Sequence, residues 1–261
     1  MKRKRSINSK AVTGIILLII AVVSAVFVRF TGESDKVFEA VGLRNTELSD
    51  RDKMYVSFID VGQGNCTLLK CGDKAILVDS GEVGAAQTVI NYIKNQNIKT
   101  LDCVLVTHPH SDHMGAMTKL LYEFKIKDVI MPEIPEEIIP TSKTYEKFLV
   151  AVSENAENVI AAKPDETFSY GEMKMEIFAP LRDYEDLNDM SAVTRISYGD
   201  TSVMFTGDAT ATVEKDLLKK NIDYSATILN VGHHGSKTST SESWLKAVDP
   251  EYAVICCGLN N

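Results

Sequence analysis

Three of the chain's five histidines lie in one short segment, THPHSDH at residues 107–113, directly after the apolar run LDCVLV. Neutral imidazole and carboxylate groups are ligands that zinc, manganese and iron accept. The proline between His108 and His110 keeps the chain extended, so these two side chains can converge on one ion. Asp112 and His113 fall where the next helix should begin, and they can face a second ion. The segment therefore predicts a centre for one or two divalent metals.

Two later segments also place polar side chains at the end of a strand-like run. SVMFTGD ends in Asp208, and ATILNVGHHG ends in His233 and His234. An aspartate at a strand end is by itself most often a helix cap. Here all five histidines of the chain occur at only two such ends, which favours a metal site. A carboxylate such as Asp208 can bridge two cations that hold a hydroxide nucleophile between them and clamp a hydrolysed ester.

The elements that must position these residues follow from apolar spacing and turn residues. Short β-rich runs broken by glycine turns predict strands at the start of the domain. Segments with apolar residues at helical spacing then alternate with apolar strand-like runs, first up to residue 162 and again up to residue 258. This alternation predicts an α/β fold with two packed sheets and helices outside. The expected elements are strands 54–61, 65–71 and 74–80, helix 85–96, strand 101–106, a helix after His113, strand 129–131, helix 141–153, strand 158–162, hairpins 166–180 and 192–208, helix 210–220, strand 226–232, helix 240–248 and strand 252–258.

The N-terminal part differs in character from the rest. The first ten residues carry five basic side chains and no acid, and residues 11–28 contain no charge. An uncharged run of this length can cross a membrane as a helix, and the basic residues before it favour a cytoplasmic N-terminus. A cleaved signal peptide is the alternative. We expect a basic tip and anchor at 1–30, a linker at 31–53 and a hydrolase domain at 54–261, either membrane-anchored and extracytoplasmic or secreted.

The exported part is acidic. Without the basic residues of the first ten positions, 23 Lys and Arg face 36 Asp and Glu. Such a surface repels polyanions unless a local patch or a bound metal reverses the field. The charge therefore argues against nucleic-acid binding by the surface as a whole.

Five motifs in fixed order carry a family resemblance: FIDVGQGN, ILVDSG, THPHSDHMGA, TRISYGDTSVMFTGDA and LNVGHHGSKTSTS. Together they resemble the metallo-β-lactamase superfamily, and within it the hydrolase domain of ComEC-type competence proteins. The resemblance runs from about Met54 to the end of the chain. It implies a four-layer αββα sandwich with the metal site between the sheets, at the ends of the strands.

The resemblance also implies roles for individual residues. His108 and His110 look like ligands of one metal, whereas the other metal would take Asp112, His113 and His234. Asp208 looks like the bridge. Asp112 and His233 are the expected catalytic residues, His233 as the imidazole that contacts substrate or donates a proton to the leaving group; the order of the two adjacent histidines, His233 and His234, stays open. Asp79 in VDSG looks like an acid beneath the site, with a purely structural carboxylate as the alternative.

The chain departs from the family pattern in three places. Asn65 stands where the family usually has aspartate. Many relatives supply a third histidine to the first metal from the segment before the bridging aspartate, but DLNDMSAVTR offers only Asn188, Asp189 and Ser191. Incomplete, oxygen-rich coordination makes manganese a rival to zinc. The sequence also stops soon after a strand, so we expect the last helix and strand of the sandwich to be missing.

The expected function is metal-dependent hydrolysis of a phosphoester. The leading interpretation is a phosphodiesterase or nuclease-like activity outside the membrane, with DNA as one candidate substrate. A phosphocholine-type diester is an alternative that tolerates the negative charge better. The competing class is a non-catalytic or truncated metal-binding module in a surface complex. The combination of HPHSDH with GHHGS argues against β-lactam hydrolysis.

Overall fold

The computed structural model describes residues 53–259. The expected basic tip, membrane-crossing segment and nearly all of the linker lie outside these described residues. Among residues 53–259, no helix is long and apolar enough to span a membrane.

The first sheet has six strands in the order β1-β2-β3-β4-β5-β6. Antiparallel pairing joins β1 to β2 and β2 to β3, whereas β3, β4, β5 and β6 pair in parallel. The central strand β4 is an almost continuous buried run, as a strand covered on both faces must be. The bounds are β1 Met54–Phe58, β2 Thr67–Cys71, β3 Lys74–Val78, β4 Thr100–Leu105, β5 Lys125–Met131 and β6 Ala156–Ala161.

The second sheet also has six strands, in the order β12-β11-β10-β9-β8-β7. Strands β10, β11 and β12 pair in parallel, and β7 to β10 form an antiparallel meander. Gly199 with a φ of 55° turns the β9–β10 hairpin, as the Gly-Asp dipeptide predicts. The bounds are β7 Thr167–Tyr170, β8 Met173–Ile177, β9 Thr194–Tyr198, β10 Thr201–Phe205, β11 Ile228–Asn230 and β12 Tyr252–Val254.

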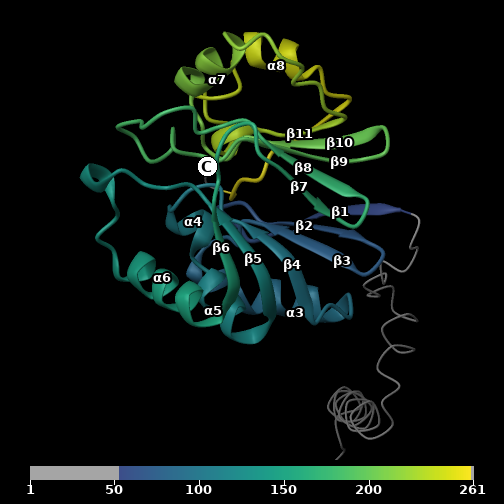
Figure 1. Ribbon diagram of the computed structural model, residues 1–261, viewed down its shortest axis with the longest axis vertical. Coiled ribbons are helices and arrows are strands. Elements are labelled where there is room, and N and C mark those ends of the chain that lie inside the picture. Colours follow the sequence, from purple (N-terminus) through teal and green to yellow (C-terminus); the bar gives the residue numbers. More distant parts are fainter. Residues whose placement is uncertain (1–52, 260–261) are drawn as a thin grey trace, which may run out of the picture. The chain divides into compact units, whose positions relative to one another are not determined.

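Helices cover the outer face of each sheet (Figure 1). In α3, Val89, Ile90 and Ile93 recur at helical spacing and are buried, and burial of each such side chain contributes roughly 1.5–3 kcal/mol. Helices α3, α5 and α6 lie on the first sheet, and α7 and α8 lie on the second. The bounds are α3 Ala86–Asn95, α4 Ser111–Met114, α5 Met117–Glu123, α6 Lys143–Asn155, α7 Ala211–Leu218 and α8 Glu242–Val248, with short 3₁₀ segments η1 Val83–Ala85, η2 Glu136–Ile138 and η3 Gly232–Gly235.

A central apolar layer joins the two sheets. Leu105 of β4 and Phe205 of β10 belong to the same buried cluster, together with Met175 of β8. The described residues thus have the order helices, sheet, sheet, helices, which confirms the predicted four-layer αββα sandwich.

The main departures from the predicted elements occur near the histidines. The helix expected after His113 begins earlier, at Ser111, and is divided into α4 and α5. A Cβ on Gly115 would lie 2.6 Å from the backbone nitrogen of Val83, so the chain must pack closely there. The strand expected at 226–232 is shorter, because the chain turns into η3 at Gly232.

Candidate metal centre

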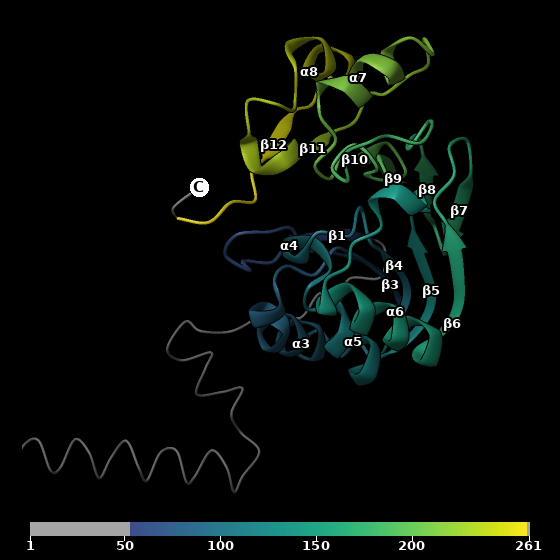
Figure 2. The ribbon, with the colours of Figure 1, turned by 90° about the vertical axis from the view of Figure 1, so that its left-hand side faces the viewer.

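The structure brings all the predicted ligands to one place. His108 and His110 follow β4, Asp112 and His113 lie in α4, Asp208 follows β10, and His233 and His234 lie in η3 after β11. In Figure 2, α4 lies on the side of the first sheet that faces β11 and β12. The site is therefore built from loops at the ends of strands in both sheets.

One group of potential ligands consists of His108, His110 and Asp208, whose ligand atoms all lie within 4.8 Å of one another. The Nε2 atom of His108 is 3.0 Å from Nδ1 of His110 and 3.8 Å from Oδ2 of Asp208. His108 is completely buried. This group matches the first metal position that the family resemblance implies.

The second group consists of Asp112, His113, Asp208 and His234, again within 4.8 Å. Nε2 of His234 lies 3.1 Å from Oδ2 of Asp112 and 3.7 Å from Oδ2 of Asp208. Nε2 of His113 lies 3.2 Å from Oδ1 of Asp208. Asp208 belongs to both groups, as a bridging carboxylate would.

Independently of the family resemblance, the buried polar atoms of these residues favour the binding of divalent cations. Nε2 of His113 and Oδ1 of Asp208 are both buried, and neither has a hydrogen-bond partner. Buried polar atoms without partners are costly, and a cation between such atoms removes the cost. The donor set of imidazoles and carboxylates suits zinc or manganese.

Asp79 supports the second group of potential ligands through His113. Its Oδ1 accepts a hydrogen bond from the backbone nitrogen of Thr107 at 2.8 Å, and its Oδ2 accepts from Thr107 Oγ1, also at 2.8 Å. The same Oδ2 lies 2.8 Å from Nδ1 of His113. A proton on Nδ1 leaves Nε2 of His113 free to face the centre, which is how carboxylates support histidine ligands. Of the two interpretations of Asp79, this geometry supports the acid beneath the site.

The segment that lacks the expected third histidine supports Asp208 instead. Ser191 is completely buried, and its Oγ accepts a hydrogen bond from the backbone nitrogen of Asp208 at 3.0 Å. A Cβ on Gly207 would lie 2.8 Å from that same Oγ, and Gly207 has a φ of 51°. Only glycine therefore fits between Ser191 and the metal-facing carboxylate.

The two adjacent histidines have an unusual backbone. His233 and His234 have φ angles of 50° and 52°, a left-handed conformation that non-glycine residues rarely adopt and that is common at functional sites. The turn aims both imidazoles into the site. Nδ1 of His234 lies 2.8 Å from the carbonyl oxygen of Cys256, so its Nε2 faces Asp112 and Asp208.

The electrostatics of the site are those of coupled opposite charges. Burial lowers the pKa of His113, but the carboxylates of Asp79 and Asp208 outweigh it and raise the pKa to about 10. Burial raises the pKa of Asp112, but His234 and His113 outweigh it and lower the pKa to about 2. For His108, burial and the neighbouring imidazoles together lower the pKa. The first group thus presents a neutral imidazole, which is the form that binds a cation.

Some supporting residues had no clear signal in the sequence. Thr107 and the carbonyl of Cys256 contact imidazoles of the potential ligands, yet a threonine and a backbone carbonyl carry no recognisable pattern. The hydroxyl-rich run after His234 was visible as part of a motif, but its contact with His233 depends on the turn geometry. Asn65 stands where the family usually has aspartate, and both of its buried side-chain polar atoms lack hydrogen-bond partners. Its backbone nitrogen donates to the carbonyl of Asp112.

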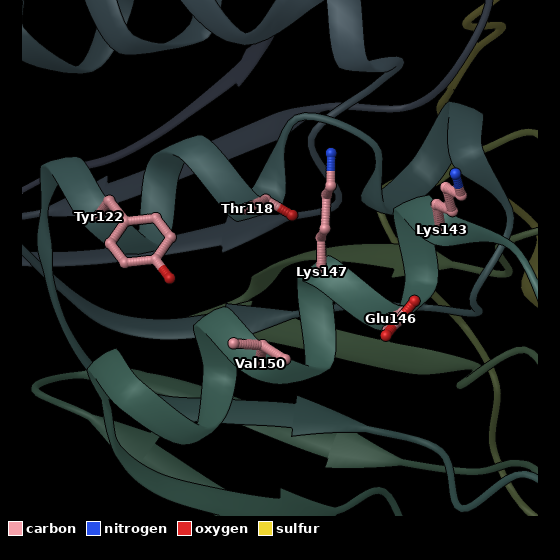
Figure 3. Close-up of a pocket in the computed structure, with 6 residues that line it drawn as sticks. All are labelled: Thr118, Tyr122, Lys143, Glu146, Lys147 and Val150. Atoms are coloured by element: carbon pink, nitrogen blue, oxygen red, sulfur yellow. The ribbon is translucent and has the colours of Figure 1, made fainter.

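A hollow of about 410 Å³ lies away from the potential metal ligands, on the outer helices α5 and α6 (Figure 3). None of its lining residues is among the potential metal ligands. A smaller groove of about 260 Å³ lies between the glycine-rich loop after β1 and the segment after β12, beside the carbonyl that holds His234. The lining residues of the larger hollow are Thr118, Tyr122, Lys143, Glu146, Lys147 and Val150.

Comparison with curated proteins finds competence and recombination proteins. The chain is 27% identical to ComE operon protein 3 of Bacillus subtilis over 79% of its length, which is 28% of that protein. It is 32% identical to Recombination protein 2 of Haemophilus influenzae over 78% of the chain and 24% of that protein. It is 29% identical to Competence protein ComA of Neisseria gonorrhoeae over 82% of the chain and 28% of that protein. The chain thus matches about a quarter of the length of these relatives, and the predicted likeness to competence proteins is confirmed.

Among solved structures, a variant of the CmlA beta-hydroxylase has a TM-score of 0.54 at 18% identity, covering 88% of this chain and 52% of that one. At this identity the likeness concerns the fold alone. The model of the metallo-beta-lactamase superfamily matches residues 59–259, nearly all of the described chain. The chain therefore belongs to the metallo-beta-lactamase superfamily.

Proposed function

We propose that this protein is a metal-dependent phosphodiesterase with a nuclease-like activity. The observation that carries the proposal is the position of Asp208, which belongs to two neighbouring groups of potential ligands. A pair of cations sharing one carboxylate suits in-line displacement at phosphorus, because the two ions contact the attacking and leaving oxygens. The superfamily consists generally of hydrolases, which agrees with this reaction type.

In this proposal each predicted residue has a defined task. His108 and His110 hold one ion, and Asp112, His113 and His234 hold the other, with Asp208 shared. Bound ions would polarise the phosphoryl group and supply a nucleophilic water at neutral pH. Asp112 is only partly buried, so in this proposal it also orients a group on the substrate, whereas Nδ1 of His113 contacts Asp79. His233 belongs to neither ligand group, but its Nε2 faces Asp208. It is therefore the predicted residue that is left to contact the substrate.

The metal is zinc or manganese. Four of the six proposed ligands are imidazoles, which favours zinc, whereas the first group has only two imidazoles and a shared carboxylate. A site with few protein ligands leaves positions for water and substrate, and manganese tolerates such oxygen-rich surroundings. The expected one or two ions per chain become two in this proposal, because Asp208 belongs to both ligand groups.

For the substrate we propose a DNA strand, because the relatives include a competence protein and a recombination protein. The chain matches only a quarter of each relative, so their activities as whole proteins come to this chain as a proposal alone. The excess of acidic residues favours a second candidate, a small phosphocholine-type diester. The uncharged run at residues 11–28 supports a membrane anchor with the hydrolase domain outside the cytoplasm, or secretion if it is cleaved.

The test is metal-dependent cleavage by the purified full-length chain. Single-stranded DNA and bis-p-nitrophenyl phosphate are offered with zinc or with manganese, and Asp208→Asn is the matched variant. We expect both substrates to be cleaved, and we expect the variant to lose at least 100-fold in kcat/KM. Cleavage of the small diester alone would favour headgroup-type substrates. A folded, metal-loaded protein that cleaves neither substrate would favour the non-catalytic module.

A further inference from the structure

His233 differs from the proposed metal ligands in its surroundings. Its Nε2 lies 3.8 Å from Oδ2 of Asp208, beyond hydrogen-bond distance, and its side chain is 28% exposed. Its backbone nitrogen donates to the carbonyl of Gly207 at 3.1 Å, which fixes the imidazole against the loop that carries Asp208. The ring therefore reaches the site with one nitrogen still available to a substrate.

The other nitrogen of His233 is held by a chain of hydroxyl groups. Nδ1 lies 3.2 Å from Oγ1 of Thr238, and that oxygen lies 2.9 Å from Oγ of Ser236. The backbone nitrogen of Thr238 donates to Oγ of Ser236 at 3.4 Å, and the carbonyl of Thr238 accepts from Ala211 at 2.9 Å. The turn that carries both hydroxyls is thus closed on itself and anchored to α7.

The backbone donor favours one direction of hydrogen bonding between these hydroxyl groups. A backbone N–H can only donate, so Ser236 Oγ accepts from Thr238 and has its own proton available for Oγ1 of Thr238. Thr238 can then donate its proton to Nδ1 of His233. A neutral imidazole that accepts at Nδ1 carries its proton on Nε2.

We propose that Ser236 and Thr238 select the Nε2–H tautomer of His233, and that His233 acts as a neutral hydrogen-bond donor to a non-bridging phosphoryl oxygen of the substrate. This inference rests on the proposed phosphodiesterase function. The imidazole keeps its proton throughout. When the P–O bond breaks, the leaving oxygen takes its proton from solvent water. Thr238 is a positioning residue, and His233 contacts the substrate.

The tautomer itself can be measured without any turnover. Histidine is labelled with ¹⁵N in the full-length, zinc-loaded protein, and the two ring nitrogens of His233 are assigned by NMR in the wild type, Thr238→Val and Thr238→Ser. We expect the proton on Nε2 in the wild type and in Thr238→Ser, which keeps the hydroxyl. We expect a mixture of tautomers in Thr238→Val. A proton on Nδ1 in the wild type, or a spectrum unchanged in Thr238→Val, would overturn the inference.

Leaving-group dependence tests the role of His233 in the reaction. The p-nitrophenyl ester of thymidine 5′-phosphate has a good leaving group, and the dinucleotide TpT has a poor one. We expect His233→Ala to lose about 100-fold on both substrates, and His233→Gln, which keeps an N–H donor, to lose less. We expect Thr238→Val to lose about three- to tenfold on both, the size of one neutral hydrogen bond.

A loss that is at least tenfold greater on TpT would mean that His233 protonates the leaving group, which would contradict the inference. If the wild type cleaves neither substrate, the proposed function fails and the NMR result alone decides the tautomer. The two failures are therefore distinguishable.

Discussion

At the scale of single residues, one side chain and one backbone carbonyl position two imidazoles of the candidate metal centre. Asp79 faces Nδ1 of His113, and the carbonyl of Cys256 faces Nδ1 of His234. Each leaves Nε2 directed at Asp208. Such supporting contacts are commonly worth 10- to 100-fold in metal affinity.

Replacing Asp79 tests this support. Asp79→Asn keeps the shape but removes the charge, so it should weaken metal binding about 10- to 100-fold. The measurement is competition between the protein and a metal chelator. Asp183→Asn, at an exposed aspartate outside the ligand groups, is the control and should bind like the wild type. An unchanged metal affinity in Asp79→Asn would show that Asp79 does not act through His113.

At the scale of elements, β4 connects two neighbouring strands through one buried carboxylate. Oδ1 of Asp102 lies 2.7 Å from Nζ of Lys127 in β5 and 3.3 Å from Nζ of Lys74 in β3, and Oδ2 accepts from the backbone nitrogen of Ala75. The far end of β4 leads directly into His108. This contact holds the strand that delivers the first ligands.

Burial raises the pKa of Asp102, but the hydrogen bonds from Lys127, Ala75 and Lys74 outweigh it and lower the pKa. Since the folded-state pKa lies below the unfolded value of about 3.9, the carboxylate stabilises the fold above that pH. The stabilisation is lost as the pH falls through the folded-state pKa. Asp102→Asn should therefore cost about 1–3 kcal/mol in the free energy of unfolding at pH 7, and less at pH 3.

Urea unfolding at pH 7, 5 and 3 measures this difference. Asp73→Asn is the matched control, because Asp73 is 87% exposed and lies 3.9 Å from the same Lys74. It should change the free energy of unfolding by less than about 0.5 kcal/mol. A cost for Asp102→Asn that is equal at pH 7 and pH 3 would mean that the charge is not responsible.

The sequence predicted the elements whose apolar residues have a strong period, and it did not predict details that depend on close tertiary contacts. The spacing of Val89, Ile90 and Ile93 predicts α3 within a residue or two. The residues expected as metal ligands lie together in the two groups of potential ligands. The division of the helix after His113 was missed, because the close approach of Gly115 to Val83 is a tertiary contact. The strand expected at 226–232 is present but shorter, because β11 ends at Asn230 and the chain turns into η3 at Gly232.

At the scale of the whole molecule, the two sheets meet at the proposed metal centre. His108 and His113 come from the first sheet and its loops, whereas Asp208 and His234 come from the second. Bound metal would thus join the two halves of the sandwich. A ligand that binds only the folded state stabilises it in proportion to the logarithm of its concentration above Kd.

Removal of metal should therefore lower the stability of the full-length protein. At a metal concentration of about 100 times Kd, the loss after chelation should be about 2.7 kcal/mol in the free energy of unfolding. Thermal unfolding with and without EDTA, and after zinc is restored, measures it. The control is Asp208→Asn, which should show a much smaller response to EDTA. An equal response in the variant would place the stabilising ion elsewhere.

The most direct test of the account is the number of metal ions bound by three forms of the full-length protein. Elemental analysis of the wild type, His110→Ala and Asp208→Ala counts the ions after equilibration with zinc. The shared position of Asp208 predicts two ions in the wild type, one in His110→Ala and fewer than one in Asp208→Ala. A folded Asp208→Ala protein with the full complement of zinc would contradict the bridging role and, with it, the proposed centre.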